Sequence, residues 1–204
     1  MNTRTVLIPL LFAVAASLSA EDPCCCAAKV ATTSAAPAAL PDTSLYQLDA
    51  RWQNQDGADV ALADLAGAPV IITMVFSHCA YACPRIVADL KAIRAALPVA
   101  TRDHVRVVLA SFDSTRDTPA RLHEWAAEQN LGAGWTLLHG DENAVRELSV
   151  LLDIPYVPQP DGSFGHGNRI VLLDRHGVAV TAIEGLGAPS APLVEAVTAL
   201  MQAP

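Results

Sequence analysis

Two cysteines four positions apart, Cys79 and Cys83, are the side chains of this sequence best suited to carry out chemistry. Their thiolate forms bind soft metal ions and attack disulfide bonds, so the pair predicts a metal site or a redox site. A plain structural disulfide is the alternative interpretation. A bridge between such near neighbours constrains the unfolded chain little, and this favours the metal or redox role.

The cysteines lie where an expected strand meets an expected helix. The apolar, β-branched run at 69–76 predicts a short buried strand. Apolar residues from Ile86 to Leu97 recur at spacings of four, three and four positions, which predicts a helix with Pro84 in its first turn. Because residues i and i+4 are neighbours on a helix surface, the two sulfurs can converge. The positive end of the helix also favours thiolate over thiol.

Length and composition indicate one folded domain after a leader. The chain has 204 residues, of which 52% are hydrophobic, and its formal net charge is −8. Proteins that bind nucleic acid place basic patches against the phosphates, so this acidic balance argues against a nucleic-acid partner.

Residues 1–20 have the pattern of an export signal peptide or a short membrane anchor. Arg4 gives a positive start, and the uncharged run from Thr5 to Ala20 is 16 residues long, which is short for a membrane span. We therefore expect the domain to be periplasmic or otherwise extracytoplasmic. Contact with the membrane is expected only through an uncleaved anchor.

Residues 21–43 predict a flexible tether, because Ala, Thr, Ser and Pro dominate its second half. Three adjacent cysteines stand near its start, Cys24, Cys25 and Cys26. They are either a loose metal-collecting tail or an incidental cluster. The folded domain is expected over residues 44–204.

Strand and helix patterns alternate through this domain. After a predicted hairpin within 45–62, further strands are expected at 104–110, 135–138, 170–173 and 178–183. Helices are expected to begin at a cap formed by Asp117 or Thr118, at Asp141 and near Ser190, and a loop at 153–165. This order predicts an α/β, thioredoxin-like fold with a central mixed sheet flanked by helices and an amino-terminal β-hairpin extension.

Several of these residues together resemble the Sco/SenC family, the thioredoxin-like copper chaperones of cytochrome oxidase assembly. The resemblance covers roughly Leu45 to Met201. The matching residues are Phe76, Cys79, Cys83, Pro84, Asp113, the run from Arg116 to Pro119, His166, Asp174 and Gly177.

The resemblance implies a copper site formed by Cys79, Cys83 and the distant His166. Thiolates select Cu(I), and imidazole serves Cu(I) or Cu(II), so these residue types suit copper on chemical grounds as well. His166 stands between two glycines, and we expect it in a flexible loop. Asp113 and His78 are candidates for auxiliary roles at the site.

The function implied by the resemblance is that of a metallochaperone, which loads copper into a respiratory oxidase copper site or maintains the thiols of that site. Its partners would be an oxidase subunit or another copper-accepting protein, together with a thiol reductase. The alternative is an extracytoplasmic thiol–disulfide oxidoreductase, in which Cys79 attacks and Cys83 resolves the mixed disulfide. Such enzymes place a cis-proline before the strand after the long loop, and residues 164–169 contain no proline.

Two short segments depart from the family pattern. Ala80-Tyr81 stands where Pro-Asp is usual after the first cysteine, and Ser114-Thr115 stands where Pro-Glu is common. A carboxylate beside the cysteine would oppose thiolate formation, so its absence predicts more acidic thiols here.

Overall fold

A seven-stranded mixed sheet is the centre of the computed structural model, which describes residues 40–202. The signal or anchor predicted at 1–20, most of the tether at 21–43 and Cys24, Cys25 and Cys26 lie outside the described residues. The strands follow the order β2-β1-β5-β4-β3-β8-β9. Their bounds are β1 (Arg51–Asn54), β2 (Asp59–Ala61), β3 (Val70–Val75), β4 (Arg106–Ser111), β5 (Trp135–Gly140), β8 (Arg169–Leu173) and β9 (Ala179–Glu184).

Strand β3 leads into the cysteine segment and lies between β4 and β8 in the sheet. All six of its residues are buried, because helices cover both faces of the sheet and leave β3 no solvent-exposed side. Strands β3, β4 and β5 are parallel, whereas β8 and β9 are antiparallel to their neighbours. The predicted α/β class and mixed central sheet are therefore confirmed.

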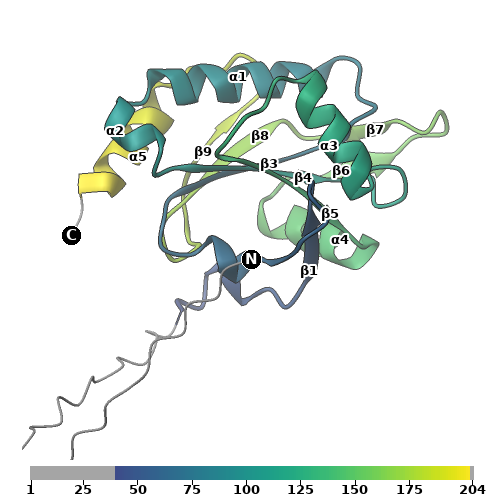
Figure 1. Ribbon diagram of the computed structural model, residues 1–204, viewed down its shortest axis with the longest axis horizontal. Helices are drawn as coiled ribbons and strands as arrows, with labels where there is room; N and C mark the ends of the chain where they lie inside the picture. The colour runs from purple at the N-terminus through teal and green to yellow at the C-terminus, as the bar shows by residue number, and fades with distance from the viewer. Residues whose placement is uncertain (1–39, 203–204) are drawn as a thin grey trace, which may run out of the picture. The chain divides into compact units, whose positions relative to one another are not determined.

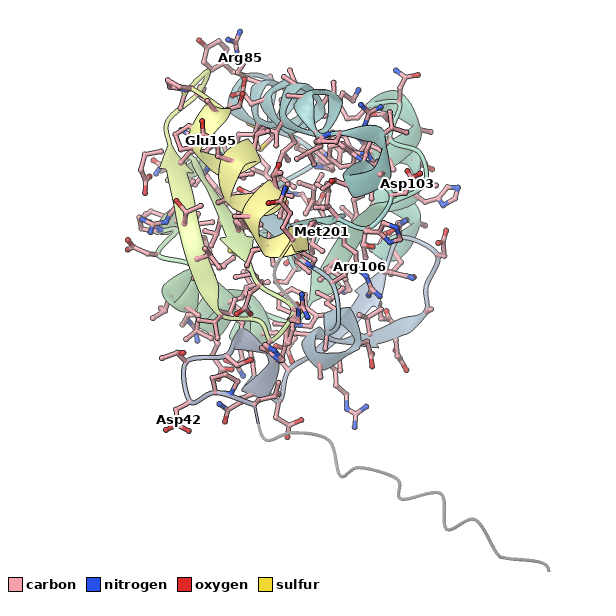
Figure 2. All side chains as sticks on the ribbon, turned by 90° about the vertical axis from the view of Figure 1, so that its left-hand side faces the viewer. Asp42, Arg85, Asp103, Arg106, Glu195 and Met201 are labelled. Carbon is pink, nitrogen blue, oxygen red and sulfur yellow. The ribbon has the colours of Figure 1, made fainter. Side chains whose placement is uncertain are left out.

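The helices are α1 (Ala82–Ala96), α2 (Val99–Arg102), α3 (Pro119–Glu128), α4 (Glu142–Leu151) and α5 (Ala191–Gln202), with short 3₁₀ turns at Leu45–Gln47 and Leu62–Leu65. Figure 1 shows α1 and α3 on one side of the sheet and α4 on the other. Figure 2 shows α5 alongside β9, with Glu195 and Met201 on successive turns of that helix. Among the described residues, no helix combines the length and the hydropathy needed to cross a membrane.

Two helices begin at the predicted capping residues. The Thr118 side chain accepts a hydrogen bond from the Arg121 backbone N–H, and Pro119 occupies the first position of α3. The Asp141 side chain accepts from the Ala144 N–H at the start of α4. Each cap satisfies a backbone donor that the helix itself leaves without a partner. Of the two candidates for the α3 cap, Thr118 is the cap, so Asp117 is left for another purpose.

The two amino-terminal strands belong to the main sheet. Strand β1 pairs antiparallel with β2 and, on its other side, antiparallel with β5. Trp52 of β1 is fully buried against Gly140, where an added Cβ would lie 2.6 Å from the indole ring. The absence of a side chain at Gly140 therefore leaves room for the Trp52 ring where β1 pairs with β5.

The segment predicted as a loop at 153–165 contains a second, two-stranded antiparallel sheet, and this part of the prediction was wrong. Strand β6 (Tyr156–Pro158) pairs with β7 (Phe164–His166), and Tyr156 lies opposite His166. The prolines that argued against a strand exclude only a central strand, because an edge strand tolerates a residue without an N–H. This small sheet carries the histidine of interest.

Candidate metal centre

Two sulfurs and an imidazole from separate elements meet at one end of the sheet. One ligand atom from each of Cys79, Cys83 and His166 lies within 4.8 Å of the other two. Cys83 Sγ lies 3.9 Å from His166 Nε2. Cys79 belongs to the segment between β3 and α1, Cys83 to the first turn of α1, and His166 to β7. Both cysteines are free thiols.

Backbone hydrogen bonds fix the two sulfurs. The Phe76 N–H donates to Cys83 Sγ at 3.4 Å, and the Cys83 N–H donates to Cys79 Sγ at 3.3 Å. The Cys79 N–H in turn donates to the Phe76 carbonyl at 3.2 Å. Tyr81, the residue at the N-cap of α1, makes no side-chain capping bond. Cys79 Sγ thus accepts one of the backbone donors that open the helix.

The two thiols differ sharply in acidity. A hydrogen bond from the Cys83 thiol is the largest cause that lowers the pKa of Cys79 to about 4, and backbone N–H groups act in the same direction against the opposing effect of burial. The same hydrogen bond to Cys79, followed by burial, raises the pKa of Cys83 far above its ordinary value. Cys79 is half-buried and Cys83 is fully buried. At neutral pH, Cys79 is therefore the thiolate and Cys83 retains its proton.

The imidazole of His166 is oriented with one nitrogen toward the sulfurs. Its Nδ1 lies 2.9 Å from the Gly167 carbonyl oxygen. A carbonyl oxygen can only accept, so Nδ1 carries the proton and Nε2 presents its lone pair toward Cys83. This is the tautomer that a metal-ligating histidine uses when its other nitrogen is held by the protein.

His166 lies in a strand and not in the flexible loop that the flanking glycines predicted. Its ring centroid is 5.0 Å from that of Phe112 and 6.0 Å from that of Phe76. Gly165 is paired with Val157 in the small sheet, and the Gly167 N–H donates to the Pro155 carbonyl. The imidazole is thus held by strand pairing and by aromatic packing on two sides.

The sequence reasoning missed the aromatic residues beside His166. The rings of Tyr156 and Phe164 each lie within 6.3 Å of the Phe112 ring, and all three line a groove of about 490 Å³ next to the site. The pattern Tyr-x-Pro before Phe-x-His could have indicated them only if the hairpin had been recognised. These rings form an apolar wall on one side of the imidazole.

His78 and Asp113, the candidates for auxiliary roles, do not join the cysteines. Their side chains group instead with Asp117, and the three ligand atoms lie within 4.8 Å of one another. Asp113 is held by Arg116, whose backbone N–H and guanidinium both donate to its carboxylate. Asp117 was considered as a helix cap and as part of the run from Arg116 to Pro119 that matches the family, but not for a role at the site, although it is completely buried beside it. Thr118 is sufficient as the cap of α3, so the sequence already left Asp117 without a capping role, and this was the available sign of another role.

This arrangement defines a class of protein, namely thioredoxin-like domains that carry a Cys-x3-Cys pair facing a distant histidine. The chain belongs to the SCO1/SenC family, whose family model matches residues 42–202. The predicted membership is therefore confirmed.

Individual relatives agree with this membership. A protein from Stutzerimonas stutzeri that is named for copper binding is 27% identical over 128 residues, or 61% of this chain and 62% of the relative. A SCO1 protein homolog from Bacillus subtilis (strain 168) is 29% identical over 113 residues, or 54% of this chain and 58% of the relative. This chain therefore matches about three fifths of the length of these two relatives.

Among solved structures, copper-bound ScoI from Bradyrhizobium japonicum has a TM-score of 0.62 and 23% sequence identity. The similarity covers 74% of this chain and 96% of that chain. At this identity the similarity establishes the fold, and it confirms the predicted thioredoxin-like architecture.

Proposed function

We propose that this protein is a metallochaperone that binds one copper ion between Cys79, Cys83 and His166. The observation that carries the proposal is the convergence of two thiols and an imidazole within 4.8 Å. Two soft sulfur donors favour Cu(I), and the imidazole extends the set to Cu(II). Three protein ligands leave a coordination position open, through which an acceptor can take the ion by ligand exchange.

The protonation states of the free site indicate how loading proceeds. Cys79, half-buried and already a thiolate, is the first donor that an incoming ion meets. Cys83 must lose its proton to become the second sulfur ligand, so binding at neutral pH releases about one proton and not two. His166 needs no change of tautomer, because Nε2 already offers its lone pair.

We propose that the acceptor is a respiratory oxidase subunit or another copper-accepting protein, and that the chain works outside the cytoplasm. Support comes from the family membership, from the relative named for copper binding and from the export pattern in residues 1–20. In an oxidising compartment, a thiol reductase would be needed to keep Cys79 and Cys83 reduced.

The test is an anaerobic Cu(I) titration of the reduced protein against a chromophoric competitor. Cys24, Cys25 and Cys26 are replaced by serine in every sample, so that only the proposed site supplies thiols. We expect about one tightly bound Cu(I), lost in Cys79→Ser and in Cys83→Ser. The oxidised protein, with both sulfurs in a disulfide, is expected not to load. Full-affinity binding by either serine variant or by the oxidised protein would contradict the site.

Thiol–disulfide exchange is the second candidate, and one specific observation favours it. Cys79 combines a depressed pKa with partial exposure, and Cys83 lies behind it as a buried thiol. In this reaction Cys79 attacks a partner disulfide and releases one partner thiolate. Cys83 then attacks the mixed disulfide, which leaves the Cys79–Cys83 bridge and frees the second partner thiolate. A stopped-flow assay with a small aromatic disulfide measures this activity without copper.

A further inference from the structure

A buried carboxylate lies directly behind the cysteine segment and belongs to neither the sulfur pair nor the histidine. Asp117 has no exposed surface. Its oxygens accept hydrogen bonds from the Ser77 N–H at 2.8 Å, from the Ser77 hydroxyl at 2.5 Å and from the Ser111 hydroxyl at 2.5 Å. Burying a carboxyl group is costly unless it is hydrogen-bonded, and three donors bond to its oxygens here.

We propose that Asp117 is a positioning residue for the metal centre. It holds the segment that carries Cys79 against the end of β4, so that the two sulfurs and the imidazole converge. This inference rests on the proposed copper-binding function for its main measurement.

The position of Asp117 is transmitted to both cysteines through short connections. Ser77 stands between Phe76 and Cys79 in the chain, and the Phe76 backbone contacts both cysteines, donating to Cys83 Sγ and accepting from the Cys79 N–H. Two bonds from Asp117 to Ser77 therefore fix the turn that sets both sulfurs.

On its other side, Asp117 is anchored to the strand next to β3. Ser111 is the last residue of β4 and lies opposite Val75 of β3 in the parallel register. Its hydroxyl donates to Asp117 and accepts from the Asp113 N–H, while the Asp117 N–H donates to the Asp113 carbonyl. Asp117 thus links the carboxyl ends of β3 and β4. The bond from its N–H to the Asp113 carbonyl also stabilises the loop that carries it.

The groups around Ser77 extend this network to the surface. Arg121 Nε donates to the Ser77 hydroxyl at 3.2 Å, and the guanidinium is held by Glu128 at 2.7 Å. His78 Nδ1 lies 3.1 Å from the same hydroxyl and 3.8 Å from Asp117 Oδ1. These groups surround the segment with polar partners, so its geometry is set before a metal arrives.

A second metal site at His78, Asp113 and Asp117 does not fit these contacts. The Asp117 oxygens are occupied by serine donors, and the Asp113 carboxylate is occupied by Arg116. The network is therefore a support for the thiol pair and not a separate binding site.

The test is the isosteric substitution Asp117→Asn in the full chain, with Cys24, Cys25 and Cys26 again replaced by serine. An asparagine amide offers one acceptor oxygen in place of two, so the bond that the Ser77 hydroxyl donates to Asp117 Oδ1 is lost or reversed while the side-chain volume is kept. Loss of a hydrogen bond to a charged group corresponds to about a tenfold change or more. We expect Cu(I) affinity to fall by about tenfold and the thiolate-to-Cu(II) charge-transfer band to shift.

The matched control is Asp141→Asn, which also replaces a carboxylate that accepts a backbone N–H, at the remote N-cap of α4. We expect its copper affinity to stay within about twofold of the parent, because no site contact changes. A folded Asp117→Asn protein with the parent's copper affinity and absorption band would overturn the proposal. An equal loss of affinity in Asp141→Asn would also overturn it, since the effect would then be one of general stability.

Ser111→Ala decides the question if Asp117→Asn does not fold. This variant removes the bond to Asp117 on the side away from the cysteines, together with the bond from the Asp113 N–H, and a fall in copper affinity of about threefold or more supports the proposal. No change would contradict it.

A second measurement works without copper. The alkylation rate of Cys79 by iodoacetamide reports how its segment is held, and Asp117→Asn is expected to change this rate by about threefold or more. If the parent protein binds no copper, the proposed function fails while this rate still tests the positioning role. An unchanged rate would then refute that role.

Discussion

Replacing His166 with alanine removes the imidazole from the site while leaving both cysteine sulfurs in place. The two sulfurs alone can hold Cu(I), which accepts two-coordinate thiolate binding, whereas Cu(II) depends more on the nitrogen donor. Changing only an outer-shell partner of a ligand typically costs 10–100-fold in metal affinity. We therefore expect loss of the ligand itself to lower Cu(II) affinity by more than about 100-fold and Cu(I) affinity by about tenfold.

His166→Ala is also expected to lower the free energy of unfolding. The flexible loop that the flanking glycines predicted would have given little such effect. The substitution removes the hydrogen bond from Nδ1 to the Gly167 carbonyl, which contributes about 1 kcal/mol, and two ring contacts with Phe76 and Phe112 of about 0.5 kcal/mol each. A total of about 2 kcal/mol corresponds to a fall in Tm of about 4–8 °C for a chain of this size. Copper affinities must therefore be measured well below the lowered Tm of the variant.

The assay pairs competitive titration with Cu(I) and Cu(II) and the rate of reduction of a small aromatic disulfide. His104→Ala is the matched control, because His104 is exposed and is not grouped with the cysteines. Disulfide reduction should change little in His166→Ala, since that reaction needs only the two sulfurs. Unchanged copper binding in both oxidation states, with a collapse of disulfide reduction, would refute the chaperone reasoning and favour the oxidoreductase.

Two further results are expected. Because the pKa of Cys79 is lowered to about 4, its alkylation rate should stay nearly constant from pH 8 down to about pH 5 and fall as the pH drops through 4. A rate that already falls below about pH 8, as it does for an ordinary thiol, would contradict the assignment of Cys79 as a thiolate. Gly177→Ala should lower the free energy of unfolding by about 2 kcal/mol or more in urea titrations, because Gly177 has φ +79° and a Cβ there would lie 2.6 Å from the Tyr46 ring; an unchanged midpoint would show that this turn relaxes freely.

The sequence was most informative where local pattern and burial agree. The apolar run before Cys79 forms the central strand β3, and the periodicity from Ile86 to Leu97 forms the buried face of α1. The cap at Thr118 and the proline after it also set the start of α3 as predicted. In each case one short segment contains both the signal and its physical cause.

Other features depend on partners that come from distant segments. The hairpin of β6 and β7 was hidden by its prolines, and with it the strand position of His166 and the aromatic wall beside the imidazole. The link between Asp117 and the cysteine segment is recognisable only once Ser77 and Ser111 are known to face it from two different strand ends. Local patterns carry no information about such contacts, because the residues meet only through the sheet topology.

The difference in acidity between the two cysteines is the clearest example of a property that the sequence does not reveal. Their spacing gives no reason to expect one thiol to be more acidic than the other. The missing carboxylate after Cys79 predicted that both thiols would be more acidic, whereas the pKa of Cys79 is lowered and that of Cys83 is raised. This difference follows from the fold, in which Cys79 lies before the helix and accepts the Cys83 N–H, while Cys83 lies fully buried beneath it. One thiolate held ready beside a thiol that gives up its proton on binding suits an ion that must be both captured and released. The same difference in acidity between Cys79 and Cys83 would also suit disulfide exchange. The two functions are therefore separated by whether copper affinity depends on His166, and not by the acidity of Cys79.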